Sequence, residues 1–157
     1  MKVEFWVIGK TNAAYLQTGT AIYEKRLQHY LPFKYQTLPD IRQSGKLRPD
    51  QLKKKEGEAV QKLLKPDDHL VLLDEQGKQF ASVTFAKHLD QMLQLPKKRL
   101  IFLVGGAFGF DEAIYQRANA KLGLSKMTFS HQMIRLFFLE QLYRGMTILR
   151  NEPYHNQ

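Results

Sequence analysis

Cysteine is absent from the 157 residues of this chain. That absence excludes disulfide bonds, thiolate catalysis and metal sites with cysteine ligands. Long apolar runs are missing too, since no stretch approaches the roughly 20 residues that a transmembrane helix needs. The first residues, Met1 to Phe5, carry an acid inside a short apolar run and so resemble a strand rather than a secretory signal. We therefore expect a cytoplasmic protein that does not cross a membrane.

Acidic residues are scarce relative to basic ones. The chain holds 15 Asp and Glu against 24 Lys and Arg, which gives a formal net charge of +9 and a sequence pI near 9.7. Such an excess attracts polyanions, of which RNA is the most abundant in a cytoplasm, although charge alone does not say which RNA. The alternative is a solvated basic surface, and the basic runs at residues 53–55 and 97–99 are interpreted first in that way.

Neither an internal repeat nor a linker interrupts the chain, so residues 1–157 are expected to form one domain. Short apolar runs alternate with helical patterns. Strands are predicted at residues 2–8, 33–38, 69–73, 100–104 and 122–125, and helices at 13–30, 50–64, 82–93, 111–120 and 131–149, with Asp50 and Ser82 as helix caps and a polar loop at 39–49. This order predicts an α/β fold, with a mostly parallel sheet and helices on both faces.

Two loops are candidates for a ligand site. The buried run 100–104 breaks at Gly105 and Gly106, with Gly109 close behind, and a glycine-rich turn after a strand lets a ligand approach the backbone. An ordinary strand-to-helix turn remains the alternative. Residues 124–129 form the second loop, and loops at the carboxyl ends of neighbouring strands make the usual crevice of an α/β sheet.

The spacing of several short motifs resembles one family over essentially the whole chain. That family comprises the small bacterial SPOUT methyltransferases known as ribosomal RNA large subunit methyltransferase H. The motifs are Gly105-Gly106-x-x-Gly109, Leu124-Ser125-x-x-Thr128-x-x-His131-x-x-x-Arg135, Tyr143-Arg144 and Pro153-Tyr154-His155, with weaker matches at Val7 to Lys10, Tyr23 to Arg26, Lys55 to Glu58 and Leu73-Asp74-x-x-Gly77-Lys78. One departure is Ser130, where many relatives carry proline before the histidine.

The resemblance implies N3-methylation of a pseudouridine in 23S ribosomal RNA, on the assembled ribosome, by a homodimer with a C-terminal trefoil knot. S-adenosylmethionine (SAM) would be the methyl donor, without a metal. The residues that the resemblance assigns to SAM are Leu73, Gly105, Leu124, Ser125, Lys126, Met127, Thr128 and Phe129. Gly106 and Gly109 are expected to shape the turn instead.

The acceptor of such a reaction is an imide N–H, a poor nucleophile until it loses its proton. A cation can stabilise the resulting anion and a neutral base can take the proton. Arg144, Tyr154 and His155 are therefore the catalytic candidates. Alternatively Arg144 pairs with Glu140 along a helix, and the tail is an idle terminus. One hypothesis has the tail and Arg144 reach a single site from opposite subunits.

The last predicted helix is apolar around more than one face, which in a small domain favours burial against a second subunit. A central helix of a monomer is the alternative; Phe138 and Leu142 would lie in the contact of the dimer. Two other functions stay open for the chain as a whole. It could be a non-catalytic RNA-binding or ribosome-binding protein, or a nucleotide-binding enzyme that holds phosphate at residues 105–109.

Overall fold

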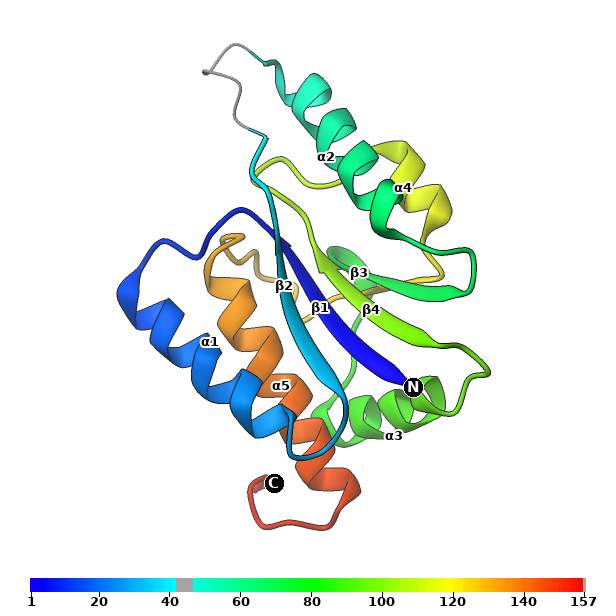
Figure 1. Ribbon diagram of the computed structural model, residues 1–157. Helices are drawn as coiled ribbons and strands as arrows, with labels where there is room; N and C mark the ends of the chain where they lie inside the picture. Colours follow the sequence, from blue (N-terminus) through cyan, green and yellow to red (C-terminus); the bar gives the residue numbers. More distant parts are fainter. Residues whose placement is uncertain (42–46, 157) are drawn as a thin grey trace.

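The computed structural model describes residues 1–41 and 47–156. In this part of the chain five strands form one sheet in the order β2-β1-β4-β3-β5, with every pairing parallel (Figure 1). The strands are β1 (Lys2–Ile8), β2 (Phe33–Leu38), β3 (Asp68–Lys78), β4 (Arg99–Val104) and β5 (Ala120–Leu122). The helices are α1 (Ala14–Leu27), α2 (Pro49–Leu63), α3 (Ser82–Leu93), α4 (Glu112–Arg117) and α5 (Met133–Leu149).

Each face of the sheet has its own apolar core, because alternate residues of a strand point to opposite faces. Phe5 and Phe102 pack against α1, α3 and α5, whereas Trp6 and Ile101 pack against α2 and α4 on the other face. Figure 1 shows the same two layers of helices around the sheet. The predicted α/β class, with a parallel sheet covered on both faces, is confirmed.

The predicted helix caps are wrong. Helix α2 begins at Pro49, one residue before Asp50, because proline has no N–H to satisfy and its fixed φ suits the first helical position. The backbone N–H of Arg48 donates to the Gln51 side chain at 3.2 Å. Ser82 is itself the first residue of α3 and makes no capping hydrogen bond. Of the predicted loop at 39–49, residues 42–46 lie outside the described residues.

The strand predicted at 122–125 ends at Leu122 instead, so Leu124 and Ser125 lie in a loop. The cause is a close crossing of chains. Strand β3 continues past Leu73 to Lys78 with a shift in register, and a Cβ on Gly77 would lie only 2.5 Å from the carbonyl carbon of Leu122. Only glycine fits there, and the chain leaves the sheet at Gly123.

The two C-terminal helices are shorter than predicted. Helix α4 ends at Arg117, since Asn119 already pairs with β3: its backbone N–H donates to the Leu70 carbonyl, and its side chain accepts from the Leu70 N–H, both at 2.8 Å. Helix α5 starts at Met133 rather than His131. In the described part of the chain, no helix is long and apolar enough to cross a membrane.

Much of the wide apolar surface of α5 is buried within this chain itself. The helix packs on the sheet and contacts both α1 and α3 (Figure 1). Phe138 and Leu142 are completely buried in the chain's own core, so they are not surface residues at which a subunit could dock. Phe137, by contrast, is 42% exposed. The homodimer stays a prediction, and a substitution at Phe137 tests it better than one at Phe138 or Leu142.

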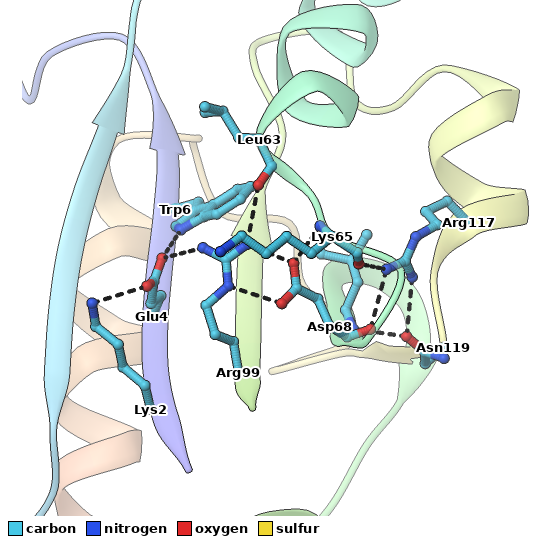
Figure 2. Close-up of polar contacts among 10 residues, drawn as sticks. Lys2, Glu4, Trp6, Leu63, Lys65, Asp68, Arg99, Arg117 and Asn119 are labelled. Carbon is cyan, nitrogen blue, oxygen red and sulfur yellow. Dashed lines mark hydrogen bonds and ion pairs between the residues drawn. The ribbon is translucent and has the colours of Figure 1, made fainter. Parts of the chain in front are cut away.

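At the amino ends of the central strands, an ion-pair network ties the sheet together (Figure 2). Arg99 donates two hydrogen bonds to Asp68, at 2.6 and 2.8 Å, and its Nη1 lies 3.5 Å from a carboxylate oxygen of Glu4. Burial acts to raise the pKa of Asp68, but the hydrogen bonds from Arg99 and from the Lys65 N–H, with the positive charges of Arg99 and Arg117, together outweigh it and lower that pKa. The interpretation of residues 97–99 as a solvated run is therefore wrong for Arg99, which has a structural role far from the loops at the carboxyl ends.

Candidate functional site

The first cavity lies at the carboxyl ends of β3, β4 and β5 and measures about 510 Å³. This volume falls in the range of small-molecule sites. Seven of the eight residues predicted to hold a cofactor line it: Leu73, Gly105, Leu124, Ser125, Met127, Thr128 and Phe129. The eighth, Lys126, is exposed and is not among the lining residues. The two loops chosen from sequence are thus brought together around one cavity.

Different constraints require glycine at two positions of the first loop: the backbone conformation at one and close packing at the other. Gly109 has φ of +83°, a conformation that residues with a side chain rarely adopt, and its N–H donates to the Gly106 carbonyl at 3.1 Å. Gly105 has no positive φ, but a Cβ on it would lie 3.1 Å from the Gly109 oxygen. The turn is therefore closed by Gly109, while the absence of a side chain at Gly105 lets the Gly109 backbone and the Phe110 ring pack against it.

Hydrogen bonds from hydroxyl side chains order the second loop. Ser125 Oγ accepts from the Met127 N–H at 3.0 Å, and Thr128 donates to a Glu75 carboxylate oxygen at 2.9 Å. Ser130 Oγ accepts from the N–H of Met133, the first residue of α5, at 3.0 Å. The Ser130 hydroxyl, which a proline at this position could not supply, thus helps to fix the start of the helix.

Polar residues that sequence reasoning did not assign to the cavity also line it. Asp74 and Glu75 follow the buried part of β3, and Tyr115 on α4 donates to Asp74 at 2.5 Å. Burial and that hydrogen bond raise the pKa of Tyr115, so the phenol stays protonated and remains a donor. The position of two acids directly after a buried strand was the signal available in the sequence.

A second cavity, of about 630 Å³, lies at the carboxyl ends of β1 and β2. It shares Gly106, Phe108 and His131 with the first cavity, so the glycine-rich loop separates the two. Glu56 of α2 lines it and is only 6% exposed. Burial, together with the nearby charge of Asp40, raises the pKa of Glu56 to about 7. Sequence reasoning noted this glutamate only as part of a motif.

The three catalytic candidates form one cluster at the C-terminal end of α5. Arg144 donates to Glu140 at 2.6 Å and to His155 Nδ1 at 3.0 Å, and its guanidinium lies 4.9 Å from the centre of the Tyr154 ring. The Tyr154 hydroxyl donates to the same Glu140 oxygen at 3.0 Å. The expected pairing of Arg144 with Glu140 is present, and the tail is packed rather than idle. Because Arg144 and the tail of one chain touch, the hypothesis that they come from opposite subunits loses its support.

Within one chain this cluster is remote from both cavities. None of its residues lines either cavity. Ile134, at the start of α5, lines the first cavity, and Arg144 follows ten residues later, about 15 Å along the helix axis. Figure 1 shows the C-terminus beyond the end of α5, away from the loops that surround the cavities. One chain therefore does not bring cavity and cluster into a single site.

Comparison with known proteins gives a consistent match. A family model described as predicted SPOUT methyltransferase matches residues 1–155. The ribosomal RNA large subunit methyltransferase H of Parabacteroides distasonis is 53% identical over 157 residues, which is the whole of both chains. The protein of the same name from Cytophaga hutchinsonii is 51% identical over 156 residues, 99% of this chain and all of that one. This chain therefore belongs to the SPOUT methyltransferases, in the family of ribosomal RNA large subunit methyltransferase H.

Proposed function

We propose that this chain, as one domain spanning residues 1–157, is a SAM-dependent methyltransferase that N3-methylates a pseudouridine in 23S ribosomal RNA. The observation that carries the proposal is the cavity at the ends of β3, β4 and β5, built from the two loops that the family motifs single out. The names of the relatives, ribosomal RNA methyltransferases of the large subunit, support the substrate class. The assembled ribosome, in the cytoplasm, is the proposed setting.

The lining of the first cavity fits SAM. Leu73, Leu124 and Met127 offer apolar cover, and the backbone of the ordered loop offers donors and acceptors to an adenine edge. Asp74 and Glu75 supply carboxylate oxygens for ribose hydroxyls, as acids after a strand do in other nucleotide sites. When bound, SAM supplies a methyl group that is already activated, so the protein has to hold the donor, exclude water and align the acceptor.

The Arg144 cluster suits the acceptor. A deprotonated imide is an anion, and a guanidinium whose position is fixed by Glu140 stabilises it without having to reorganise. The Tyr154 ring, between Arg144 and Tyr143, is a platform on which a base can stack. Because this cluster is remote from the cavity of its own chain, we place it at the cavity of a second copy.

A homodimer supplies that arrangement, since a two-fold axis gives each cavity the partner's cluster. Exposed apolar side chains on α1 and α5 are the candidate contact: Tyr15 is 67% exposed, Ile22 46% and Phe137 42%. A trefoil knot formed by the C-terminal segment belongs to the same proposal, by family membership.

Calorimetry with SAM and with ATP tests the proposal first. We expect binding of SAM; binding of ATP alone would favour the nucleotide-binding alternative, and binding of neither, with ribosomes present, would favour a non-catalytic RNA-binding protein. The second measurement is the mass of ribosomal RNA nucleosides from cells with and without the protein. We expect a methylated pseudouridine that disappears with the protein, and an unchanged nucleoside profile would contradict the proposal.

A further inference from the structure

Glu56 differs from the other buried carboxylates of this chain. Glu4 and Asp68 are each paired with Arg99, and Glu4 also accepts from the Trp6 indole at 2.7 Å. Glu56 is only 6% exposed, and within residues 1–41 and 47–156 no arginine or lysine pairs with it as Arg99 pairs with Glu4 and Asp68. Its carboxyl oxygens are not sealed in the core, because no fully enclosed side-chain oxygen of the described residues lacks a hydrogen-bond partner; they open onto the second cavity. A largely buried carboxyl group that opens onto a cavity without a paired cation is a candidate for a ligand contact or a chemical role.

The Glu56 carboxyl group lies at the boundary between the two cavities. A Cβ built on Gly106 would lie 2.6 Å from Oε2 and 2.8 Å from Oε1, so the carboxyl rests against the glycine-rich loop itself. On the other side of that loop, Gly105 lines the first cavity. A ring held in the second cavity at Glu56 is therefore separated from the proposed cofactor only by the glycine-rich loop.

Several charged groups surround Glu56. Asp40 follows β2, Lys10 follows β1, and His131 precedes α5; all three line the same cavity. Asp111, at the start of α4, lies next to Gly57, the neighbour of Glu56. Burial is the main reason that the pKa of Glu56 is raised to about 7, and Asp40 adds to it. Near neutral pH this carboxyl group therefore exchanges a proton readily, as a general base must.

The histidine of the tail is a poor candidate for that base. Arginine has donors only, so the 3.0 Å contact with Arg144 makes His155 Nδ1 the acceptor. Neutral His155 then carries its proton on Nε2 and has no free lone pair to offer a substrate. The carboxylate of the cluster, Glu140, already accepts hydrogen bonds from Arg144, Tyr154 and Gln141. The Arg144 cluster is therefore suited to stabilise an anion, and we look for the proton acceptor elsewhere.

We propose that the second cavity receives the uracil-type ring of the acceptor nucleotide and that Glu56 is the catalytic residue that accepts its imide proton. The inference rests on the proposed function and names a site for the acceptor. In the step, the N–H bond of the imide breaks, the proton passes to a carboxylate oxygen of Glu56, and the electron pair stays on the ring nitrogen. That nitrogen becomes the anion that accepts methyl, and Glu56 releases its proton to water afterwards.

The chemistry of the cavity suits such a ring. The imide N–H is a donor between two carbonyl acceptors. Glu56 provides the matching acceptor, and Lys10, which also lines the cavity, carries an ammonium group that can donate to a carbonyl. Phe108, 54% exposed and shared by both cavities, is an aromatic surface on which the ring can stack.

The test compares Glu56→Gln with Glu58→Gln, the same change at an exposed position two residues along α2. Single-turnover methylation of ribosomes is measured from pH 6 to 8.5, and SAM affinity by calorimetry. We expect Glu56→Gln to bind SAM within about twofold of wild type but to methylate about 100-fold more slowly or worse, the size of a lost general base. The wild-type rate should rise about tenfold per pH unit below pH 7 and level off above it. In Glu56→Gln only, the levelling off should be absent, because the residual reaction needs imide that has already lost its proton and so keeps rising with pH.

A binding readout without SAM makes the inference independent of turnover. In ¹³C NMR of the wild-type protein, uridine should shift the Glu56 carboxyl resonance, whereas N3-methyluridine, which lacks the imide proton, should not. The inference is overturned if both nucleosides shift the Glu56 carboxyl resonance equally, or if neither nucleoside shifts it. It is also overturned by a wild-type pH dependence that survives in Glu56→Gln and disappears in His131→Asn. If the wild-type protein transfers no methyl group at all, the proposed function fails, and the nucleoside titration still decides whether the second cavity recognises an imide.

Discussion

Replacing Arg135 by methionine should destabilise this protein strongly, although the change removes no apolar packing volume of note. Arg135 is completely buried at the start of α5. Its guanidinium donates to the carbonyls of Ile8 and Gly9, both at 2.8 Å, and to Thr11 Oγ1 and the His131 carbonyl, both at 3.0 Å. One side chain thus joins the carboxyl end of β1 to the start of α5.

The size of the effect follows from the acceptors left behind. Methionine has a similar length and no donor, so the buried carbonyls of Ile8 and Gly9 lose their partner in the variant. Each unsatisfied buried acceptor destabilises the fold by about 1–3 kcal/mol. The variant no longer has to bury a charged guanidinium, and this offsets part of the destabilisation. We expect a loss of about 2–5 kcal/mol in the free energy of unfolding, or about 6–15 °C in melting temperature for a chain of this length.

Urea unfolding followed by circular dichroism, at one fixed protein concentration, measures the effect. The control is Arg150→Met, which removes one 3.1 Å bond to the Tyr30 carbonyl and a ring contact at the surface. That variant should stay within about 1 kcal/mol of wild type. The reasoning is refuted if Arg135→Met also stays within about 1 kcal/mol with an unchanged dependence on urea, because the carbonyls would then find other partners at little cost.

Three further predictions concern the cavity and the dimer. Gly105→Val places a branched side chain where even a Cβ lies 3.1 Å from the Gly109 oxygen, so SAM affinity by calorimetry should fall at least about tenfold; unchanged affinity would place the cofactor elsewhere. Phe137→Lys should shift the light-scattering mass from a dimer to the 18.3 kDa monomer without loss of stability, whereas a wild-type mass of 18.3 kDa would contradict the dimer. Mixing Gly105→Val chains with chains that lack residues 154–157 should restore about a quarter of wild-type methylation after subunit exchange, since half of the dimers then contain one complete site; no recovery would argue that cavity and tail act within one chain.

The pattern of apolar residues was enough to predict the layered fold and the crevice that holds the first cavity. Continuous apolar runs such as 100–104 predict strands covered on both faces, and the structure places alternate members, Phe102 and Ile101, in the two cores. Parallel strands bring the loops after β4 and β5 to one edge, which is why the order of strands and loops predicted a crevice there; the individual lining residues came from the family resemblance. The sequence did not predict that α2 starts at Pro49 and α3 at Ser82, because several neighbouring residues can serve as a cap.

The roles of the charged residues, by contrast, depend on contacts that exist only in the folded chain. Glu56 and Glu58 are two positions apart on α2 and look alike in the sequence, yet one is buried against the Gly106 loop and the other faces solvent. In the sequence Arg135 is only one position of a motif, whereas in the structure it is a buried link between α5 and β1. The energy of a charged group depends on the solvent and partners that surround it, and these come from segments distant in the chain. The pattern of apolar residues encodes which surfaces are buried, whereas the contacts of a buried charge exist only once the strands and helices have packed.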